Sequence, residues 1–252
     1  MIRQTNVAGW TVLGALSLLF GGFTGCAGTP PGEFIIVQNQ VPNADCTIPA
    51  ELGAVYRGRG TLDVRLSDGY KLFPVLRNDF PPPSGGQTVD ANRIAISGFD
   101  VDVTMPANAS SNPVTDLING LRPAGARPDP LVQFSTLTSG SVASGGGNTA
   151  SSVGVVPGAL VSMIREKNFL TATNRVWITA TVHARGATLV GGVRSDGFTY
   201  PIELCDGCLL LDQGACPVAA AAGTTCNIGQ DQDVGCCESA GQLVCPSVVA
   251  SK

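Results

Sequence analysis

Alternating apolar and polar residues are the main pattern in this chain, and they predict short β-strands. The clearest strand covers residues 176–183, where every second residue is apolar. Its two faces carry Val176, Ile178, Ala180 and Val182 on one side and Trp177, Thr179, Thr181 and His183 on the other. Such a strand is half-buried, with its apolar face against a core.

Other segments show the same pattern over shorter lengths. Residues 34–37 are rich in β-branched side chains, and residues 131–137 also predict a strand. Residues 61–66 alternate strictly, and Ser67-Asp68-Gly69 then predicts a hairpin turn into a return strand at 70–73. The polar side chains of residues 61–66 are therefore expected to face solvent.

The pattern changes phase once within a longer strand. Ile94 and Ile96 have one parity, whereas Phe99, Val101 and Val103 have the other. A β-bulge at Ser97-Gly98 would return all five side chains to one face, and glycine suits such a position.

Two segments differ from the strands. Residues 139–152 consist mostly of Gly, Ser, Ala and Asn and predict a flexible loop. Residues 157–167 begin with Pro and place Leu160, Met163 and Ile164 on one face, which predicts a short helix.

Short strands with turn signals and hardly any helix predict a mainly β protein, specifically an antiparallel β-sandwich over residues 34–204. The arrangement loosely resembles immunoglobulin-like and fibronectin-type modules. Pro201 lies in the predicted strand 198–204 and places it at a sheet edge, because proline cannot donate to the ladder.

The first residues follow a different pattern. Arg3 precedes residues 7–20, which are apolar, uncharged and of the length of a secretory h-region. The run is shorter than the roughly 20 residues that a membrane-spanning helix needs. Small residues then lead to Cys26. Residues 1–25 are therefore predicted to be a signal peptide.

Phe23-Thr24-Gly25-Cys26 resembles the lipobox of bacterial lipoprotein precursors. The resemblance implies cleavage before Cys26 and a covalent diacylglycerol and N-acyl lipid on that cysteine. Ala27, where an Asp would signal retention at the inner membrane, favours the outer membrane. Two or more acyl chains give stable anchoring. Residues 26–33, with two prolines, would then form an extended tether.

The charge and composition of the chain limit the classes of partner that it is expected to bind. Removal of Arg3 with the signal peptide leaves 14 basic and 19 acidic residues, a net charge of −5. No segment has the clustered Lys and Arg that nucleic-acid binding requires, so a nucleic-acid partner is not expected. Charged residues make up 13% of the chain, which suits a Gly-rich β-protein outside the cytoplasm.

The cysteines predict a disulfide framework. If Cys26 carries lipid, eight of the nine cysteines remain, and seven of them lie in the segment 205–252. An oxidising compartment favours bridges, so we expect four, with Cys46 joined to the C-terminal group. Cys236 and Cys237 should have separate partners because a bond between neighbours is strained. The eight are Cys46, Cys205, Cys208, Cys216, Cys226, Cys236, Cys237 and Cys245.

Two alternatives apply to Cys205-Asp206-Gly207-Cys208. Its spacing is that of a zinc knuckle, but a second such pair, which a four-cysteine site needs, is missing. A redox-active pair should open a helix, whereas this one follows a predicted strand. Structural disulfides therefore remain the preferred interpretation, in a C-terminal module, residues 205–252, that bridges rather than a core hold together.

Few residues offer catalysis or metal binding. His183 is the only histidine and hence the only candidate base for a Ser-His-Asp site. Asp100 and Asp102 share a strand face and would suit a glycosidase or a cation, although solubility is the simpler role. Asp231 and Asp233 are weak calcium candidates. We expect no cofactor beyond the lipid.

The sequence as a whole predicts a non-enzymatic, lipid-anchored protein of the bacterial envelope that binds a protein or glycan partner. A structural or accessory subunit of an envelope transport or secretion assembly is the first alternative. An envelope hydrolase that uses Asp100, Asp102 or His183 is the second.

Overall fold

The structure is a computed structural model that describes residues 33–85, 89–216, 226–240 and 242–245. The predicted signal peptide, Cys26 and all of the predicted tether except Glu33 lie outside these residues. Within the described residues, no helix is both long enough and apolar enough to cross a membrane.

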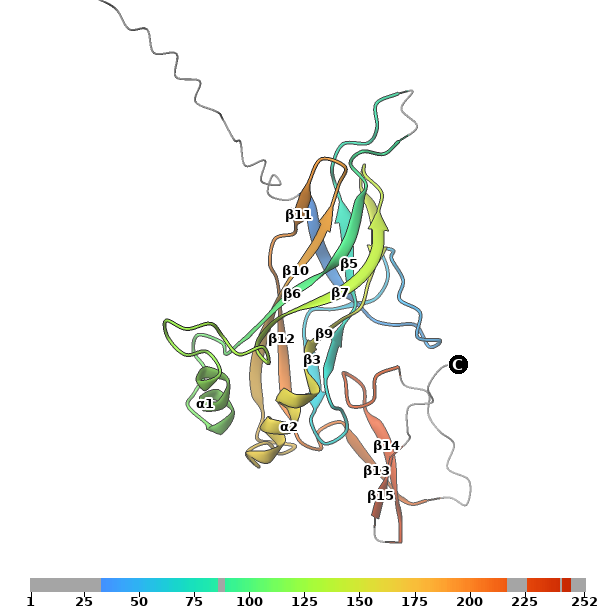
Figure 1. The fold of residues 1–252 in the computed structure, drawn as a ribbon. Helices are drawn as coiled ribbons and strands as arrows, with labels where there is room; N and C mark the ends of the chain where they lie inside the picture. The colour runs from blue at the N-terminus through green and yellow to red at the C-terminus, as the bar shows by residue number, and fades with distance from the viewer. Residues whose placement is uncertain (1–32, 86–88, 217–225, 241, 246–252) are drawn as a thin grey trace, which may run out of the picture.

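The protein is mainly β, as predicted (Figure 1). Its strands are β1 (Phe34–Gln40), β2 (Tyr56–Arg57), β3 (Gly60–Asp63), β4 (Tyr70–Leu72), β5 (Pro74–Asn78), β6 (Ile94–Thr104), β7 (Gln133–Val142), β8 (Gly147–Ala150), β9 (Val153–Val156), β10 (Val176–Ala187), β11 (Gly192–Arg194), β12 (Phe198–Cys205), β13 (Leu210–Ala215), β14 (Val234–Ser239) and β15 (Gln242–Val244). Its described helices are α1 (Pro113–Gly120) and α2 (Gly158–Glu166).

Two larger sheets and two small ones organise these strands. The first has the order β2-β1-β5-β8, and the second has the order β3-β12-β10-β6-β7 with β11 paired to β10. Strands β13-β14-β15 form a separate small sheet, and β4 pairs with β9. The predicted antiparallel pairing of residues 34–204 is wrong at one place, because β12 pairs with β3 in parallel. In the small C-terminal sheet, β13 and β14 also pair in parallel.

The long central strands confirm the alternation. Along β10, Val176, Ile178, Ala180 and Val182 are buried, and the residues between them are half-buried. The phase change in β6 is a bulge, since its pairing with β7 shifts between Ile96 and Gly98. The bulge keeps Ile94, Ile96, Phe99, Val101 and Val103 in the core, as expected.

The predicted hairpin at residues 67–73 is wrong. Strand β3 ends at Asp63 and pairs with β12, while β4 pairs with β9. Asp63 is fully buried instead of facing solvent. The reason is local: the Asp63 side chain accepts backbone hydrogen bonds from its own turn and from the loop after β12. These bonds compensate for the burial of the carboxylate.

The predicted loop at residues 139–152 is also wrong. Strand β7 continues to Val142, and β8 pairs with β5 after a turn at Gly145 and Gly146, both with positive φ. Small polar side chains do not prevent strand formation here, because an edge strand is held by the backbone bonds that its neighbour offers.

The placement of residues 198–204 at a sheet edge needs correction as well. Strand β12 lies between β10 and β3. However, β3 pairs with β12 only from Ile202 to Cys205, so Pro201 lies just outside that paired stretch. Its missing N–H therefore removes no hydrogen bond to β3.

The predicted helix at residues 157–167 is confirmed as α2, which buries Leu160, Val161 and Ile164. These side chains join one hydrophobic cluster to which both larger sheets contribute, for example Phe34 and Leu76 from the first and Val101 and Ile178 from the second. This shared core holds the body of the molecule together.

After β12 ends at Cys205, the chain builds the small sheet of β13, β14 and β15 at one end of the body (Figure 1). Residues 229–231 nevertheless return to the body. Gly229 O accepts a hydrogen bond from Asp63 N, and Asp231 N donates to Thr61 O. The module is thus attached along the edge of β3 and not only through its disulfides.

Candidate functional site

All eight cysteines that the sequence assigned to bridges are paired. The pairs are Cys46–Cys226, Cys205–Cys208, Cys216–Cys237 and Cys236–Cys245. Cys46 does join the C-terminal group, across 180 residues, and the neighbours Cys236 and Cys237 have separate partners.

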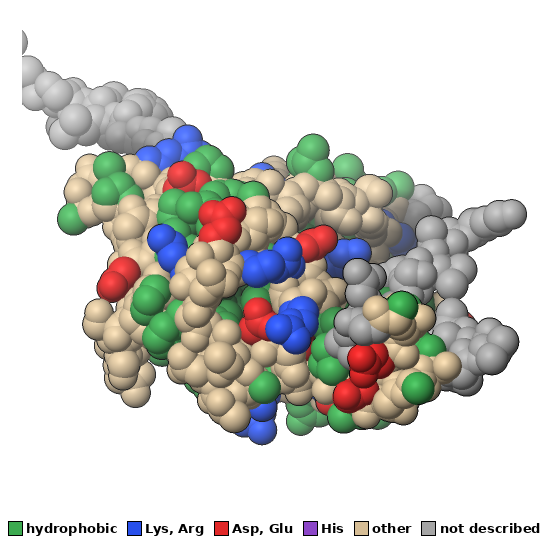
Figure 2. Space-filling model, turned by 90° about the horizontal axis from the view of Figure 1, so that it is seen from below, with side chains coloured by type: hydrophobic (Ala, Val, Ile, Leu, Met, Phe, Trp, Pro, Cys, Tyr) green, Lys and Arg blue, Asp and Glu red, His purple; other side chains and the backbone are tan. Residues whose placement is uncertain are grey.

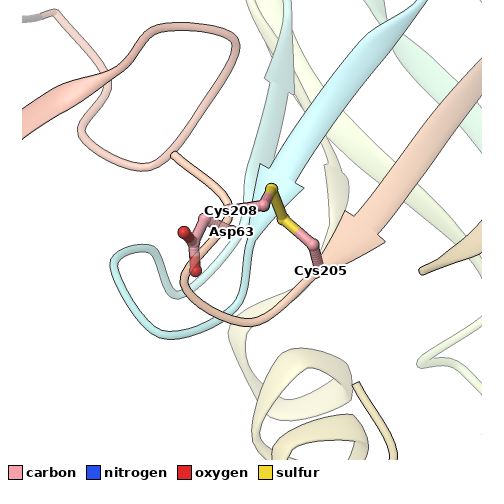
Figure 3. A group of neighbouring side chains, drawn as sticks. All are labelled: Asp63, Cys205 and Cys208. Carbon is pink, nitrogen blue, oxygen red and sulfur yellow. A yellow bond between two sulfur atoms is a disulfide. The ribbon is translucent and has the colours of Figure 1, made fainter. Parts of the chain in front are cut away.

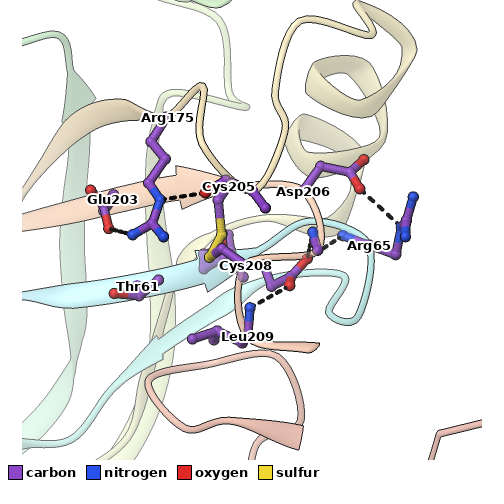
Figure 4. Close-up of a disulfide and its surroundings, with 12 residues drawn as sticks. Thr61, Arg65, Arg175, Glu203, Cys205, Asp206, Cys208 and Leu209 are labelled. Atoms are coloured by element: carbon purple, nitrogen blue, oxygen red, sulfur yellow. Dashed lines mark hydrogen bonds and ion pairs between the residues drawn. A yellow bond between two sulfur atoms is a disulfide. The ribbon is translucent and has the colours of Figure 1, made fainter. Parts of the chain in front are cut away.

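Asp63, Cys205 and Cys208 are the one group of three potential metal ligands within reach of each other among the described residues (Figure 3). The two sulfurs are bonded to each other, so neither is a thiolate ligand. The Asp63 carboxylate accepts hydrogen bonds from Arg65 N at 3.0 Å, Gly207 N at 2.8 Å and Leu209 N at 2.9 Å. Figure 4 shows Arg65 and Leu209, two of these donors, on either side of the Cys205–Cys208 disulfide. We therefore interpret the cluster as structural.

Asp100, Asp102 and His183 come together on the outer face of the second sheet. In the pairing of β6 with β10, Asp100 lies opposite His183. A depression of about 390 Å³ is lined by all three side chains. We call this surface the charged sheet face and define it by Asp100, Asp102, Arg122, His183, Arg185 and Arg194.

Arginine side chains form ion pairs with both carboxylates of the charged sheet face. Asp100 lies 2.9 Å from Arg185 Nε and 3.3 Å from Arg194 Nε. Arg122 bonds to both oxygens of Asp102. His183 Nδ1 lies 2.9 Å from Ser195 O, which fixes the ring as a donor at Nδ1. Each of these groups is therefore already held by a neighbour in the fold.

Pairing of opposite charges is also evident elsewhere on the surface. Figure 2 shows acidic and basic side chains side by side on the face seen from below, where no large patch of one sign is visible. Arg65 pairs with Asp206, and Arg175 with Glu203. This distribution offers no basic footprint of the kind that nucleic acid needs on the face in view.

A second cavity lies where the C-terminal module meets the body. This junction cavity has a volume of about 280 Å³. Its walls come from the end of β1 and the following loop, from β2, from the β4–β5 connection and from the C-terminal segment. The lining residues are Gln40, Val41, Pro42, Asn43, Ala44, Arg57, Phe73, Cys226, Asn227, Gln230, Asp231 and Gln232.

Two contacts hold the C-terminal wall of the junction cavity in place. The Cys46–Cys226 bridge joins it to the loop after β1. Gln230 is buried and pairs like a strand with the backbone of Lys71, accepting from its N at 2.9 Å and donating to its O at 2.6 Å. These contacts give the cavity a fixed wall built from distant parts of the chain.

Asp231 is the buried carboxylate of this wall. Its Oδ1 accepts a hydrogen bond from Thr61 N at 2.7 Å, and its Oδ2 accepts one from the Tyr70 hydroxyl at 2.8 Å. Arg57 Nε lies 4.0 Å from Oδ2. Burial raises the pKa of Asp231, and these hydrogen bonds oppose the shift. Asp233, the other calcium candidate, is exposed.

Tyrosines continue this network into the core. The hydroxyls of Tyr70 and Tyr200 lie 3.3 Å apart. Burial, followed by the charge of Asp231, raises the pKa of Tyr70 far above its ordinary value, so the phenol stays protonated and donates. Burial also raises the pKa of Tyr200. The network is therefore a set of fixed donors and acceptors.

Gln40 differs from Gln230 and Asp231, whose side-chain oxygens accept hydrogen bonds from the protein. Its side-chain N donates to Glu51 O at 2.7 Å, whereas its Oε1 is buried and accepts no hydrogen bond from the described residues. The residue is only 1% exposed. A buried acceptor without a donor costs about 1–3 kcal/mol, and because Gln40 lines the junction cavity, a ligand donor that reached Oε1 would remove this cost.

Sequence reasoning missed Gln40, Tyr70 and Asp63. The first two are ordinary members of strand patterns, and only the fold shows that they meet a segment more than 150 residues away. The Asp231-Gln232-Asp233 motif lies in the segment that lines the junction cavity, where protein groups bind the Asp231 carboxylate.

Comparison with known protein families, with curated proteins and with solved structures finds no match to this chain.

Proposed function

We propose that the chain is an exported, lipid-anchored binding protein of the bacterial envelope and that the junction cavity is its ligand site. The observation that carries the site is Gln40, which lines the cavity and whose buried Oε1 accepts no hydrogen bond from the described residues. Eight paired cysteines support the export part, because disulfides persist in oxidising compartments. The lipid would be attached at Cys26.

The polar groups of the junction cavity define the ligand chemistry. Gln40 Oε1 needs a donor from the ligand, and the half-exposed Arg57 guanidinium offers donors to a ligand acceptor. The nearby Asp231 leaves the cavity without a strong net charge. A small neutral molecule with hydroxyl and amide groups fits this pattern, and N-acetylated sugars of envelope glycans have both. The volume of about 280 Å³ lies just below the range of about 300–1,000 Å³ for ligand pockets, which suits a small ligand.

Titration with N-acetylglucosamine tests the site. Chemical shifts of the amides around Gln40 and Gln230 should move on addition of the sugar. Gln40→Met should weaken the affinity about tenfold, since the loss of one hydrogen bond to the ligand corresponds to about 1.4 kcal/mol. Gln38→Met is the matched control, because Gln38 also donates from β1 to the 51–52 segment but does not line the cavity.

Two results of this titration would contradict the proposed site. If the sugar and simple hydroxylated analogues move no resonance of the cavity, the proposed ligand class is wrong. If Gln40→Met and Gln38→Met bind equally well, the binding site lies elsewhere.

Anchoring is tested separately by the intact mass of the protein purified from membranes, before and after reduction. We expect the mass of a diacylated and N-acylated chain that begins at Cys26, and a gain of eight hydrogens on reduction of four bridges. An unmodified chain that begins elsewhere would refute the lipoprotein assignment.

We also propose that the two larger sheets form a β-sandwich, as the sequence predicts. The support is that inward side chains of both sheets share one buried cluster. The hydrolase alternative is less well supported, because arginines already bind Asp100 and Asp102. If a hydrolase activity were found, Asp100→Ala, Asp102→Ala and His183→Ala together should abolish it.

A further inference from the structure

Three exposed apolar side chains gather at one end of the body. Val89 is 60% exposed, and Leu189 and Val190, in the turn between β10 and β11, are 73% and 84% exposed. Leu189 N donates to Ala91 O at 3.2 Å, so this turn contacts the segment that holds Val89. We call Val89, Leu189 and Val190 the apolar tip.

The chain enters the body at the same end. Asp79 N donates to Glu33 O at 2.7 Å, and the neighbouring Asn78 side chain donates to Asn92 O at 2.8 Å. Glu33, the start of β1 and the β10–β11 turn therefore lie together (Figure 1). The small sheet of β13, β14 and β15 lies at the opposite end.

Two pairs of opposite charges lie near the apolar tip. Arg77 lies 2.7 Å from Asp79, and Arg93 lies 3.9 Å from Asp90. A tip with apolar side chains and paired charges is suited to a neutral lipid interface more than to a strongly charged protein surface.

The length of the N-terminal segment restricts what the tip can face. Six residues lie between Cys26 and Glu33, so the two are seven steps apart, and a fully extended chain of that length spans at most about 25 Å. Strand β10 alone has 12 residues and is about 40 Å long. A body held by a lipid on Cys26 must therefore keep the apolar tip close to the bilayer.

We propose that the apolar tip inserts into the lipid interface of the membrane to which Cys26 is anchored. The proposal rests on the proposed lipid anchor, because the tether brings the tip to the bilayer. Three aliphatic side chains bury too little surface to hold a free protein, but a tethered body needs no further binding energy to reach the membrane. The tip then fixes which end of the molecule faces away from the lipid.

Depth-dependent fluorescence quenching tests this orientation. The full-length lipidated protein is reconstituted in phosphatidylcholine vesicles with and without brominated acyl chains. Leu189→Trp is compared with Leu137→Trp, because Leu137 is also an exposed leucine, at 88%, but lies in the middle of β7. The parent protein supplies the background of Trp177.

The indole introduced by Leu189→Trp should lose roughly half of its fluorescence in the brominated vesicles, since interfacial side chains lie about 5–10 Å into the headgroup and acyl boundary. The indole introduced by Leu137→Trp should lose none. Equal quenching in the two variants, or quenching in neither, would overturn the insertion of the tip.

The intact mass of the same sample distinguishes a failure of the tip proposal from a failure of the proposed lipid anchor. A lipidated Leu189→Trp protein whose new indole is not quenched refutes the tip and leaves the anchor in place. A chain without lipid refutes the anchor and the tip together, because nothing then holds the body at the bilayer.

Discussion

Tyr70 and Asp231 are 161 residues apart in the sequence, and the Tyr70 hydroxyl donates a hydrogen bond to Asp231 Oδ2 at 2.8 Å. The bond joins the first third of the body to the C-terminal module. Both groups are buried, and burial raises the pKa of each. Removal of either side chain should therefore weaken the contact between the body and the C-terminal module, and not only the packing at its own position.

Asp231 should make the stability fall as the pH rises. Its pKa is raised in the folded state from about 3.8, so above pH 3.8 the folded protein retains a proton that the unfolded chain has lost. The contribution of this group is complete below pH 3.8 and disappears as the pH rises through the raised pKa. Urea unfolding of the parent and of Asp231→Asn between about pH 3 and pH 7 measures it.

The free energy of unfolding of the parent, relative to Asp231→Asn, should decrease through this window and then level off. The substitution also changes hydrogen bonds with Thr61 and Tyr70, but that effect is independent of pH. A constant difference between the two proteins at all pH values would contradict the raised pKa.

The Cys46–Cys226 bridge should contribute more stability than any other bridge. It closes a separation of 180 residues, for which chain entropy gives about 5 kcal/mol, whereas the Cys236–Cys245 bridge closes 9 residues and gives about 2.6 kcal/mol. Replacement of each pair by serine, followed by denaturant unfolding, gives the comparison. Equal losses would show that loop size does not set the contribution here.

Gly98→Ala should destabilise the protein by about 2–4 kcal/mol. Gly98 has φ +155°, and a Cβ atom there would meet the backbone carbonyl oxygen of Thr136 in the neighbouring strand. Gly154→Ala is the control, because Gly154 also lies in a strand and has open space around its Cα. Thermal unfolding should separate the two variants clearly, and similar midpoints would argue against the bulge.

Asp63→Ala should cost about 3 kcal/mol or more, because it leaves three backbone N–H groups without their acceptor. Asp233→Ala, at an exposed position of the same charge, should change stability by less than about 0.5 kcal/mol. Denaturant unfolding of both variants checks this. A mild effect at Asp63 would indicate that the loop after β12 has another source of order.

The sequence predicted what depends on local pattern. Strand β10, the bulge in β6 and helix α2 follow from the spacing of their apolar side chains. The number of bridges and the attachment of Cys46 follow from the parity of the cysteine count and from the predicted oxidising compartment. In each case the deciding information lies within a few residues or in a simple count.

What the sequence could not predict depends on distant partners. Asp63 looks like a solvent-facing strand residue until the loop of Gly207 and Leu209 supplies its donors. Strand β8 has a loop composition, and β5 makes it a strand. The junction cavity exists only because residues 226–232 return to the body, and nothing in their composition specifies this position.

The contact between Thr61 and Asp231 spans 170 residues, and it has a consequence for biosynthesis. Strand β3 receives its neighbour on one side from β12 and its remaining partners from residues 229–231. Strand β3 can therefore complete its hydrogen bonds only after residue 231 has left the ribosome. The edge of β3 thus stays open for most of the synthesis of the chain.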